Sequence, residues 1–434
     1  MGNIPPSVIR QPPRPRRIPA ADIREEESKA EVPPLKVLVL PDDQIDGGKS
    51  TRATRTYYLR RCKRKSPTSI ESLPAELLFE ILSRVPGQDI YEARLVCRKW
   101  YRTIHNRDFI NAQLGHATYG LLLRTQKHET DSFLIHARGG RAEISKFRCQ
   151  RRCLVLTSCN GLMLEFEKKN LDNIYVSNPA TGQIFVLPPY VRGVNSLRLW
   201  GIAYASVSME YKVVLPIRTG QFSKERCYIL TVGVDKSWRS VDLRHLSSEA
   251  TRAFWSTPVI TEGFIHWFCV RSNMGLTLNV ETEIFTETPG LRPSQHIHED
   301  QTNIYLSTGK YLSLLRPCGE FSWQVWEMRP ENGEWIKMGS FCLESQRRRF
   351  KQLGLILPTE ANTRLLSFRR RTHVVPVGWV KYMEVLALSS ADVSRRTIFI
   401  FNLVTGEFDE MELPSFRLDY KIMMHKSSLV WLCG

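Results

Sequence analysis

Residues 73–86 read LPAELLFEILSRVP, and a short distance further on residues 96–100 read VCRKW. Apolar side chains recur at helical spacing between Leu77 and Val85, which predicts an amphipathic helix with one broad apolar side. Pro74 suits the first turn of that helix, because a proline there loses no hydrogen bond. The stretch therefore predicts a helix that begins near Pro74 and ends at the Pro86–Gly87 pair.

Two further short helices are expected before residue 105. Asp89 is expected to cap the second helix, and Trp100 and Ile104 mark the third. Three such helices enclose a very small core, and a core of that size is marginal by itself. We therefore expect part of the apolar side of the first helix to be covered by another protein.

From about Thr118 onward the apolar pattern changes to a period of two, and aromatic residues become frequent. Short runs rich in Val, Ile, Phe, Tyr and Trp are each followed by Gly, Pro, Asn or Thr, which is typical of an all-β domain with short strands. The expected strands include residues 174–176, 184–187, 228–230, 264–268 and 398–401.

A degenerate repeat runs through this region, in which a strand, a hairpin turn and a second strand recur. The turns are marked by Thr181, Trp238, Thr282, Trp335 and Thr405. Their spacing resembles that of four-stranded propeller blades, and residues 116–434 allow six or seven blades. We expect residues 428–432 to close the ring by pairing with strands near residues 118–147.

The early residues differ in composition from the rest of the chain. Residues 1–68 are rich in Pro and Arg and have little to bury, which predicts a disordered basic tail. The whole chain has 434 residues and a formal charge of +17, which favours acidic partners or a nuclear address. None of its ten cysteines lies in a Cys-x-x-Cys pair, which suits a reducing compartment, and the group Cys149, Cys153 and Cys159 is interpreted as buried strand residues.

Signatures of catalysis are weak. Gly48-Lys49-Ser50 has Asp43 where a phosphate-binding loop needs glycine, and the common hydrolase, zinc-protease and dinucleotide motifs do not occur. His296 and His298 are interpreted as part of a solvated loop, and His266 as a hydrogen-bonded core or rim histidine. We expect no catalytic residue, no cofactor and no metal site.

The segment 73–100 resembles the F-box in order and spacing. The resemblance implies binding of a SKP-type adaptor and, through it, membership of a cullin–RING ubiquitin ligase. For Ile81, Val96 and Trp100 a purely internal packing role remains an alternative. The implied adaptor-binding residues are Leu73, Pro74, Leu77, Leu78, Ile81, Leu82, Val85, Pro86, Ile90, Val96, Cys97 and Trp100.

The remainder is similar to the plant-type F-box-associated family, whose domain is a kelch-like β-propeller. The matching motifs are SCNGL at residues 158–162, NPATG at 178–182, EYKVV at 210–214 and GFIHW at 263–267. The resulting fold class is α+β and multidomain, with a disordered tail (1–68), an all-α F-box (69–115) and an all-β, propeller-like domain (116–434). The motifs themselves are interpreted as turns and core strands.

Three clusters of basic residues remain. A nuclear-import signal and a solvated linker are both compatible with Arg60, Arg61, Lys63, Arg64 and Lys65. Two triplets are expected on loops, where they either bind an acidic or phosphorylated target or are simply solvated: Arg347, Arg348, Arg349, Arg369, Arg370 and Arg371.

Together these features predict a non-catalytic substrate receptor of an SCF-type ubiquitin ligase, located in the nucleus, the cytoplasm or both. Its partners would be the adaptor and an unidentified substrate protein, with no membrane. The alternatives are a nuclear nucleic-acid-binding or scaffold protein, and a propeller that is an enzyme or binds sugars. Scattered positive charge without interleaved aromatic residues disfavours nucleic acid.

Overall fold

The computed structural model describes residues 70, 73–125, 131–138, 141–148, 153–167, 170–190, 200–217, 225–268, 274–291, 303–319, 321–352, 355–356, 372–391, 397–412 and 420–430. All of these residues lie within one compact unit, residues 67–434. The predicted disordered tail, residues 1–68, therefore lies outside the described residues. So do the basic run 60–65 and the histidine pair 296 and 298. Within the described residues, no helix is long and apolar enough to cross a membrane.

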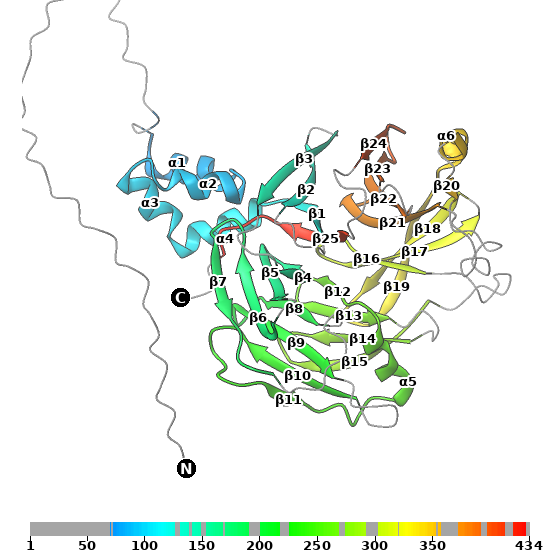
Figure 1. Cartoon of the computed structure of the whole chain (residues 1–434), viewed down its shortest axis with the longest axis horizontal. Coiled ribbons are helices and arrows are strands. Elements are labelled where there is room, and N and C mark those ends of the chain that lie inside the picture. The colour runs from blue at the N-terminus through cyan, green and yellow to red at the C-terminus, as the bar shows by residue number, and fades with distance from the viewer. Residues whose placement is uncertain are drawn as a thin grey trace, which may run out of the picture. The chain divides into compact units, whose positions relative to one another are not determined.

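Four helices form a small unit ahead of the strands (Figure 1). The three predicted helices are confirmed, and a fourth that was not predicted precedes the first strand. Asp89 does not cap the second helix as predicted, because that helix begins at Gly87 and Asp89 lies within its first turn. The bounds are α1 (Ala75–Ser83), α2 (Gly87–Ala93), α3 (Arg98–Ile104) and α4 (Arg107–His116).

The described strands form six sheets, which are the blades of a six-bladed β-propeller (Figure 1). The first three blades are β25 (Tyr420–Lys426), β1 (Tyr119–Thr125), β2 (Asp131–Arg138) and β3 (Arg141–Arg148); β4 (Leu154–Cys159), β5 (Leu162–Glu167), β6 (Asn170–Asn178) and β7 (Gln183–Val186); and β8 (Gly201–Ala205), β9 (Glu210–Ile217), β10 (Arg226–Thr231) and β11 (Arg239–Val241).

The other three blades complete the ring, and the last of them has five strands. They are β12 (Val259–Thr261), β13 (Phe264–Phe268), β14 (Met274–Asn279) and β15 (Ile284–Pro289); β16 (Ile304–Ser307), β17 (Leu312–Gly319), β18 (Ser322–Arg329) and β19 (Glu334–Cys342); and β20 (Leu355–Ile356), β21 (Thr372–Lys381), β22 (Val385–Ala391), β23 (Thr397–Asn402) and β24 (Phe408–Glu412). Short helices α5 (Ser248–Thr251), η3 (Arg252–Trp255), η4 (Glu344–Gln346) and α6 (Arg347–Gln352) lie between strands.

The repeat found in the sequence corresponds to one defined place in each blade. Every marker lies at or just after the turn between the third and fourth strands of its four-strand repeat. In three of these turns the asparagine that ends the third strand accepts a side-chain hydrogen bond from the backbone N–H two residues further on; these residues are Asn178, Asn279 and Asn402. The repeated asparagine therefore fixes the hairpin, as expected for this residue type in a turn.

The ring closes in the first blade, where strands from both ends of the domain pair. β25 pairs antiparallel with β1, and Tyr119 lies opposite Lys426. The prediction that residues 428–432 would form this strand is wrong, because the pairing strand ends at Lys426 and Ser427–Val430 follow it as irregular chain. We call Ser427–Val430 the closing segment.

Each of four blades holds one fully buried tryptophan in its core: Trp200, Trp267, Trp323 and Trp379. The innermost strands β4, β8, β12, β16, β21 and β25 contact one another in succession around the axis. Aromatic cores of this size account for a large share of the apolar area buried on folding.

Candidate functional site: the helical unit and the propeller axis

Helix α1 has a buried and an exposed apolar side. Leu78 and Leu82 are 1% and 3% exposed and pack in the core of the helical unit, whereas Leu77 and Ile81 are 53% and 47% exposed. Both pairs are spaced four residues apart, so each pair lies on one side of the helix. The helical unit thus fills its own core and still leaves an aliphatic surface uncovered.

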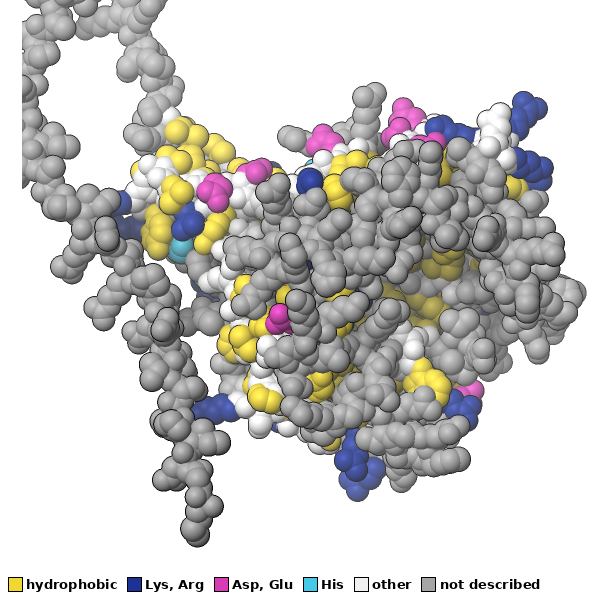
Figure 2. Space-filling view, viewed as in Figure 1, with side chains coloured by type: hydrophobic (Ala, Val, Ile, Leu, Met, Phe, Trp, Pro, Cys, Tyr) yellow, Lys and Arg dark blue, Asp and Glu magenta, His cyan; other side chains and the backbone are white. Residues whose placement is uncertain are grey.

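Other exposed apolar side chains of the helical unit lie outside α1. Leu95 and Val96 in the turn before α3 are exposed, as is Tyr101 on α3. The Lys99 ammonium donates to the Leu73 carbonyl at 3.4 Å, which links the start of α3 to the chain just before α1. We call Leu77, Ile81, Leu95, Val96 and Tyr101 the apolar face; Figure 2 shows hydrophobic side chains gathered on the helical unit.

The structure divides the predicted adaptor-binding residues into two groups. Four of them are buried in the core of the helical unit and cannot contact a partner without unfolding: Leu78, Leu82, Ile90 and Trp100. The others are exposed or half-buried: Leu73, Pro74, Leu77, Ile81, Val85, Pro86, Val96 and Cys97. A purely internal packing role, the alternative to adaptor binding, thus fits Trp100 but fits neither Ile81 nor Val96.

Sequence reasoning missed Leu95 and Tyr101. Tyr101 directly follows Trp100, and Trp100 and Ile104 form the buried side of α3. A large side chain next to a buried stripe points away from the core, so the spacing already contained this signal. Leu95 lies in a turn, where periodicity gives no such guide.

The prediction that the first arginine triplet lies on a loop is wrong, because Arg347, Arg348 and Arg349 are the first three residues of helix α6. Arg347 pairs with Glu344, and Arg349 lies over the Phe408 ring and pairs with Glu410 at 3.8 Å. Only Arg348 of the three is shown without such a contact within the described part of the chain. The second triplet, residues 369–371, lies outside the described residues.

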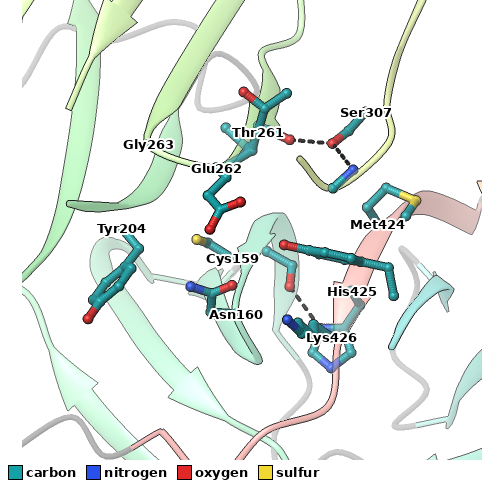
Figure 3. A pocket seen from close by; sticks show the side chains of 14 residues that line it. Cys159, Asn160, Tyr204, Thr261, Glu262, Gly263, Ser307, Met424, His425 and Lys426 are labelled. Carbon is teal, nitrogen blue, oxygen red and sulfur yellow. Dashed lines mark hydrogen bonds between the residues drawn. The ribbon is translucent and has the colours of Figure 1, made fainter. Parts of the chain in front are cut away.

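A pocket lies on the propeller axis, where innermost strands from five blades end (Figure 3). Its cavity volume is about 30 Å³, room for about two water molecules. Cys159, Tyr204, Thr261, Ser307 and Lys426 contribute to its wall from β4, β8, β12, β16 and β25 respectively. The pocket is therefore a product of the ring and not of any single blade.

The charged groups of this pocket are Lys426 and Glu262. Burial lowers the pKa of the Lys426 ammonium, and the nearby Glu262 carboxylate partly opposes that change. Burial also raises the pKa of the Cys159 thiol to about 12, so this cysteine is protonated at neutral pH and is a poor nucleophile. The arrangement suits binding of a small polar group rather than bond chemistry.

His266 is a core residue, as predicted. It is 1% exposed, and its ring nitrogens lie 2.9 Å and 3.0 Å from the Thr261 and Thr277 hydroxyls. His425 is similarly buried, with Nδ1 2.7 Å from the Ser158 hydroxyl. Burial lowers the pKa of both histidines.

A four-helix unit with an uncovered apolar face, joined to a six-bladed propeller, is the architecture of an F-box protein with a β-propeller. Residues 70–110 match the family described as F-box-like, and residues 122–363 match the family described as F-box associated beta propeller domain. The chain belongs to the F-box-associated β-propeller family, whose members are generally non-catalytic.

Curated relatives are F-box proteins of Arabidopsis thaliana. The chain is 27% identical over 184 residues to putative F-box only protein 15, covering 40% of this chain and 48% of that protein. It is also 27% identical over 210 residues to F-box/WD-40 repeat-containing protein 1, covering 48% of this chain and 47% of that protein. The matched regions thus span about half the length of these relatives.

Proposed function

We propose that the protein is the substrate-recognition subunit of an SCF-type ubiquitin ligase. The helical unit docks a SKP-type adaptor, and the propeller binds a target protein. The observation that carries the proposal is the division of α1, in which Leu78 and Leu82 complete the internal core while Leu77 and Ile81 stay uncovered. An aliphatic surface on such a small unit is the kind of surface that a partner helix or groove buries.

The role of the chain in catalysis is proximity. A receptor that holds a target next to a conjugating enzyme raises the effective concentration of the target lysine and needs no reactive group of its own. The protonated Cys159 and the neutral buried histidines fit that role.

The charge distribution supports a protein target over nucleic acid. On the propeller, Arg239 donates to Glu283 and Asp235, and Lys212 pairs with Glu283 at 2.8 Å. Arg244 is likewise paired with Asp242. Basic side chains held by carboxylates are not gathered into a track for a phosphate backbone.

The test is the affinity of the full chain for a purified SKP-type adaptor, measured by calorimetry. Leu77 and Ile81 are each about half exposed, so burying the rest of each contributes about 1 kcal/mol. A Leu77→Ala, Ile81→Ala double variant should therefore bind about 30-fold more weakly. Leu73→Ala, Pro74→Ala should also weaken binding, because it removes the apolar residues ahead of α1.

The matched control is Val404→Ala, an aliphatic residue 74% exposed in a propeller turn, which should leave adaptor affinity unchanged. A wild-type chain that does not bind the adaptor contradicts the proposal. So does a double variant that binds as tightly as the wild type. In that case salt-dependent binding to nucleic acid becomes the next measurement.

A further inference from the structure

The closing segment, Ser427–Val430, lies between the helical unit and the propeller and contributes to both cores. Leu429 is 0% exposed and packs in the same cluster as Leu78 and Leu82 of α1. The next residue, Val430, is 7% exposed and belongs to the propeller core cluster that contains Trp200. Two consecutive side chains thus fill two different cores.

Buried side chains from both sides hold the backbone of this segment. On the helical side, Gln113 of α4 is 1% exposed; its carbonyl accepts from the Leu429 N–H at 3.3 Å, and its amide donates to the Ser427 carbonyl at 3.5 Å. On the propeller side, the Asn178 amide donates to the carbonyls of Ser428 and Val430 at 3.0 Å and 2.8 Å.

Two glycines leave room for the segment. Gly87 opens α2, and a Cβ there would lie 2.9 Å from the Ser428 nitrogen. Gly161 lies in the β4–β5 turn, where a Cβ would lie 2.3 Å from the Ser428 hydroxyl oxygen. Gly161 belongs to the SCNGL motif, and Asn178 belongs to the NPATG motif. Both motifs therefore form turns that also hold the closing segment.

These contacts make the helical unit dependent on a part of the chain more than 300 residues away. Leu429 stands among the few side chains that fill a very small core, so its removal leaves a cavity that four short helices cannot close. The segment directly follows β25, which is paired with β1, so this pairing places the start of the segment beside the helical unit.

We propose that the closing segment makes adaptor binding conditional on closure of the propeller ring. This inference rests on the proposed function, since it assigns a regulation to the adaptor-binding unit. In a chain whose ring is open, Leu429 is absent from the helical core and the apolar face lacks a stable scaffold. The adaptor then binds only those chains in which the helical unit is formed. Its apparent affinity is the intrinsic affinity multiplied by the fraction of such chains.

The coupling is reciprocal. If ring closure favours adaptor binding, adaptor binding must favour ring closure by the same factor. Binding of an adaptor to the apolar face is therefore expected to slow amide hydrogen exchange in β25 and in the closing segment, although neither belongs to that face.

The experiment compares full-length Leu429→Ala with Leu388→Ala by adaptor calorimetry and hydrogen exchange. Leu388 is equally buried, in the core of the sixth blade, and shares no cluster with the helical unit. We expect Leu429→Ala to weaken adaptor binding at least tenfold and to speed exchange in α1 and α4. Leu388→Ala should stay within twofold of the wild type, and Leu429→Met, which keeps the volume, should restore most of the affinity.

The possible outcomes distinguish the proposed function from the coupling between ring closure and adaptor binding. A wild-type chain that fails to bind the adaptor overturns the proposed function. A wild-type chain that binds, together with a Leu429→Ala variant that binds equally well and keeps native exchange in α1, overturns the coupling. Equal weakening by Leu388→Ala and Leu429→Ala also overturns it, because the effect would then be general instability. Adaptor binding without added protection at residues 420–430 overturns the reciprocal part.

Discussion

Acidification from pH 7 to pH 5 should weaken the fold through two buried histidines. Burial lowers the pKa of His266 to about 3 and that of His425 to about 4. In the unfolded chain a histidine has a pKa of about 6.5. Between these values the unfolded chain binds protons that the folded chain excludes, so the stabilisation is complete above about pH 6.5 and falls as the pH drops toward 4.

The size of the effect follows from the same values. At pH 5 an unfolded histidine is almost fully protonated while its folded counterpart is almost fully neutral. Each histidine then costs about 2 kcal/mol of unfolding free energy relative to pH 7. The two together remove about 4 kcal/mol, which is a large part of the stability of an ordinary domain.

The assay is urea unfolding at both pH values for the wild type and for His266→Gln and His425→Gln. Carboxylates contribute the same background to all three proteins, so the comparison isolates each histidine. Each variant should lose about 2 kcal/mol less than the wild type on going from pH 7 to pH 5. An equal loss in all three proteins would refute the reasoning.

Three further substitutions test the packing. Glu165→Gln removes the carboxylate that pairs with Arg124; the two side chains are 5% and 1% exposed. The variant should cost about 3 kcal/mol in urea unfolding, and a cost below about 1 kcal/mol would argue against a buried ion pair. Trp267→Ala should cost about 3–5 kcal/mol, seen as a lower melting temperature, and an unchanged value would count against the blade core. Gly161→Ala should speed hydrogen exchange in the closing segment, whereas Gly406→Ala, with a similarly positive φ but open space around it, should not; equal effects would point to backbone strain alone.

The blade pattern was readable from the sequence because the hairpin chemistry repeats. Asn178, Asn279 and Asn402 perform the same hydrogen bonding in three blades, so their surroundings look alike in the sequence. The first blade carries no such marker, since it is assembled from β25 and three strands that begin at Tyr119. A blade made from two distant pieces of chain leaves no local repeat.

The closing strand was misplaced for a related reason. Residues 428–432 have the apolar composition of a strand, but Leu429 and Val430 are apolar because each enters a different core. Composition reports that a residue is buried and does not report which element covers it. The same limit applies to α1, where the neighbours Leu77 and Leu78 look equivalent in sequence and differ in exposure.

Tyr119 lies opposite Lys426, so the chain enters and leaves the ring within a single residue pair. Everything between those two positions is, in topological terms, an insertion into the helical unit. The returning chain is held at this junction by the Asn160 carbonyl, which accepts from the Ser428 hydroxyl, and by the Asn178 amide, which donates to the Ser428 carbonyl. The two ends of the ring and the core of the helical unit therefore meet at one place in the fold.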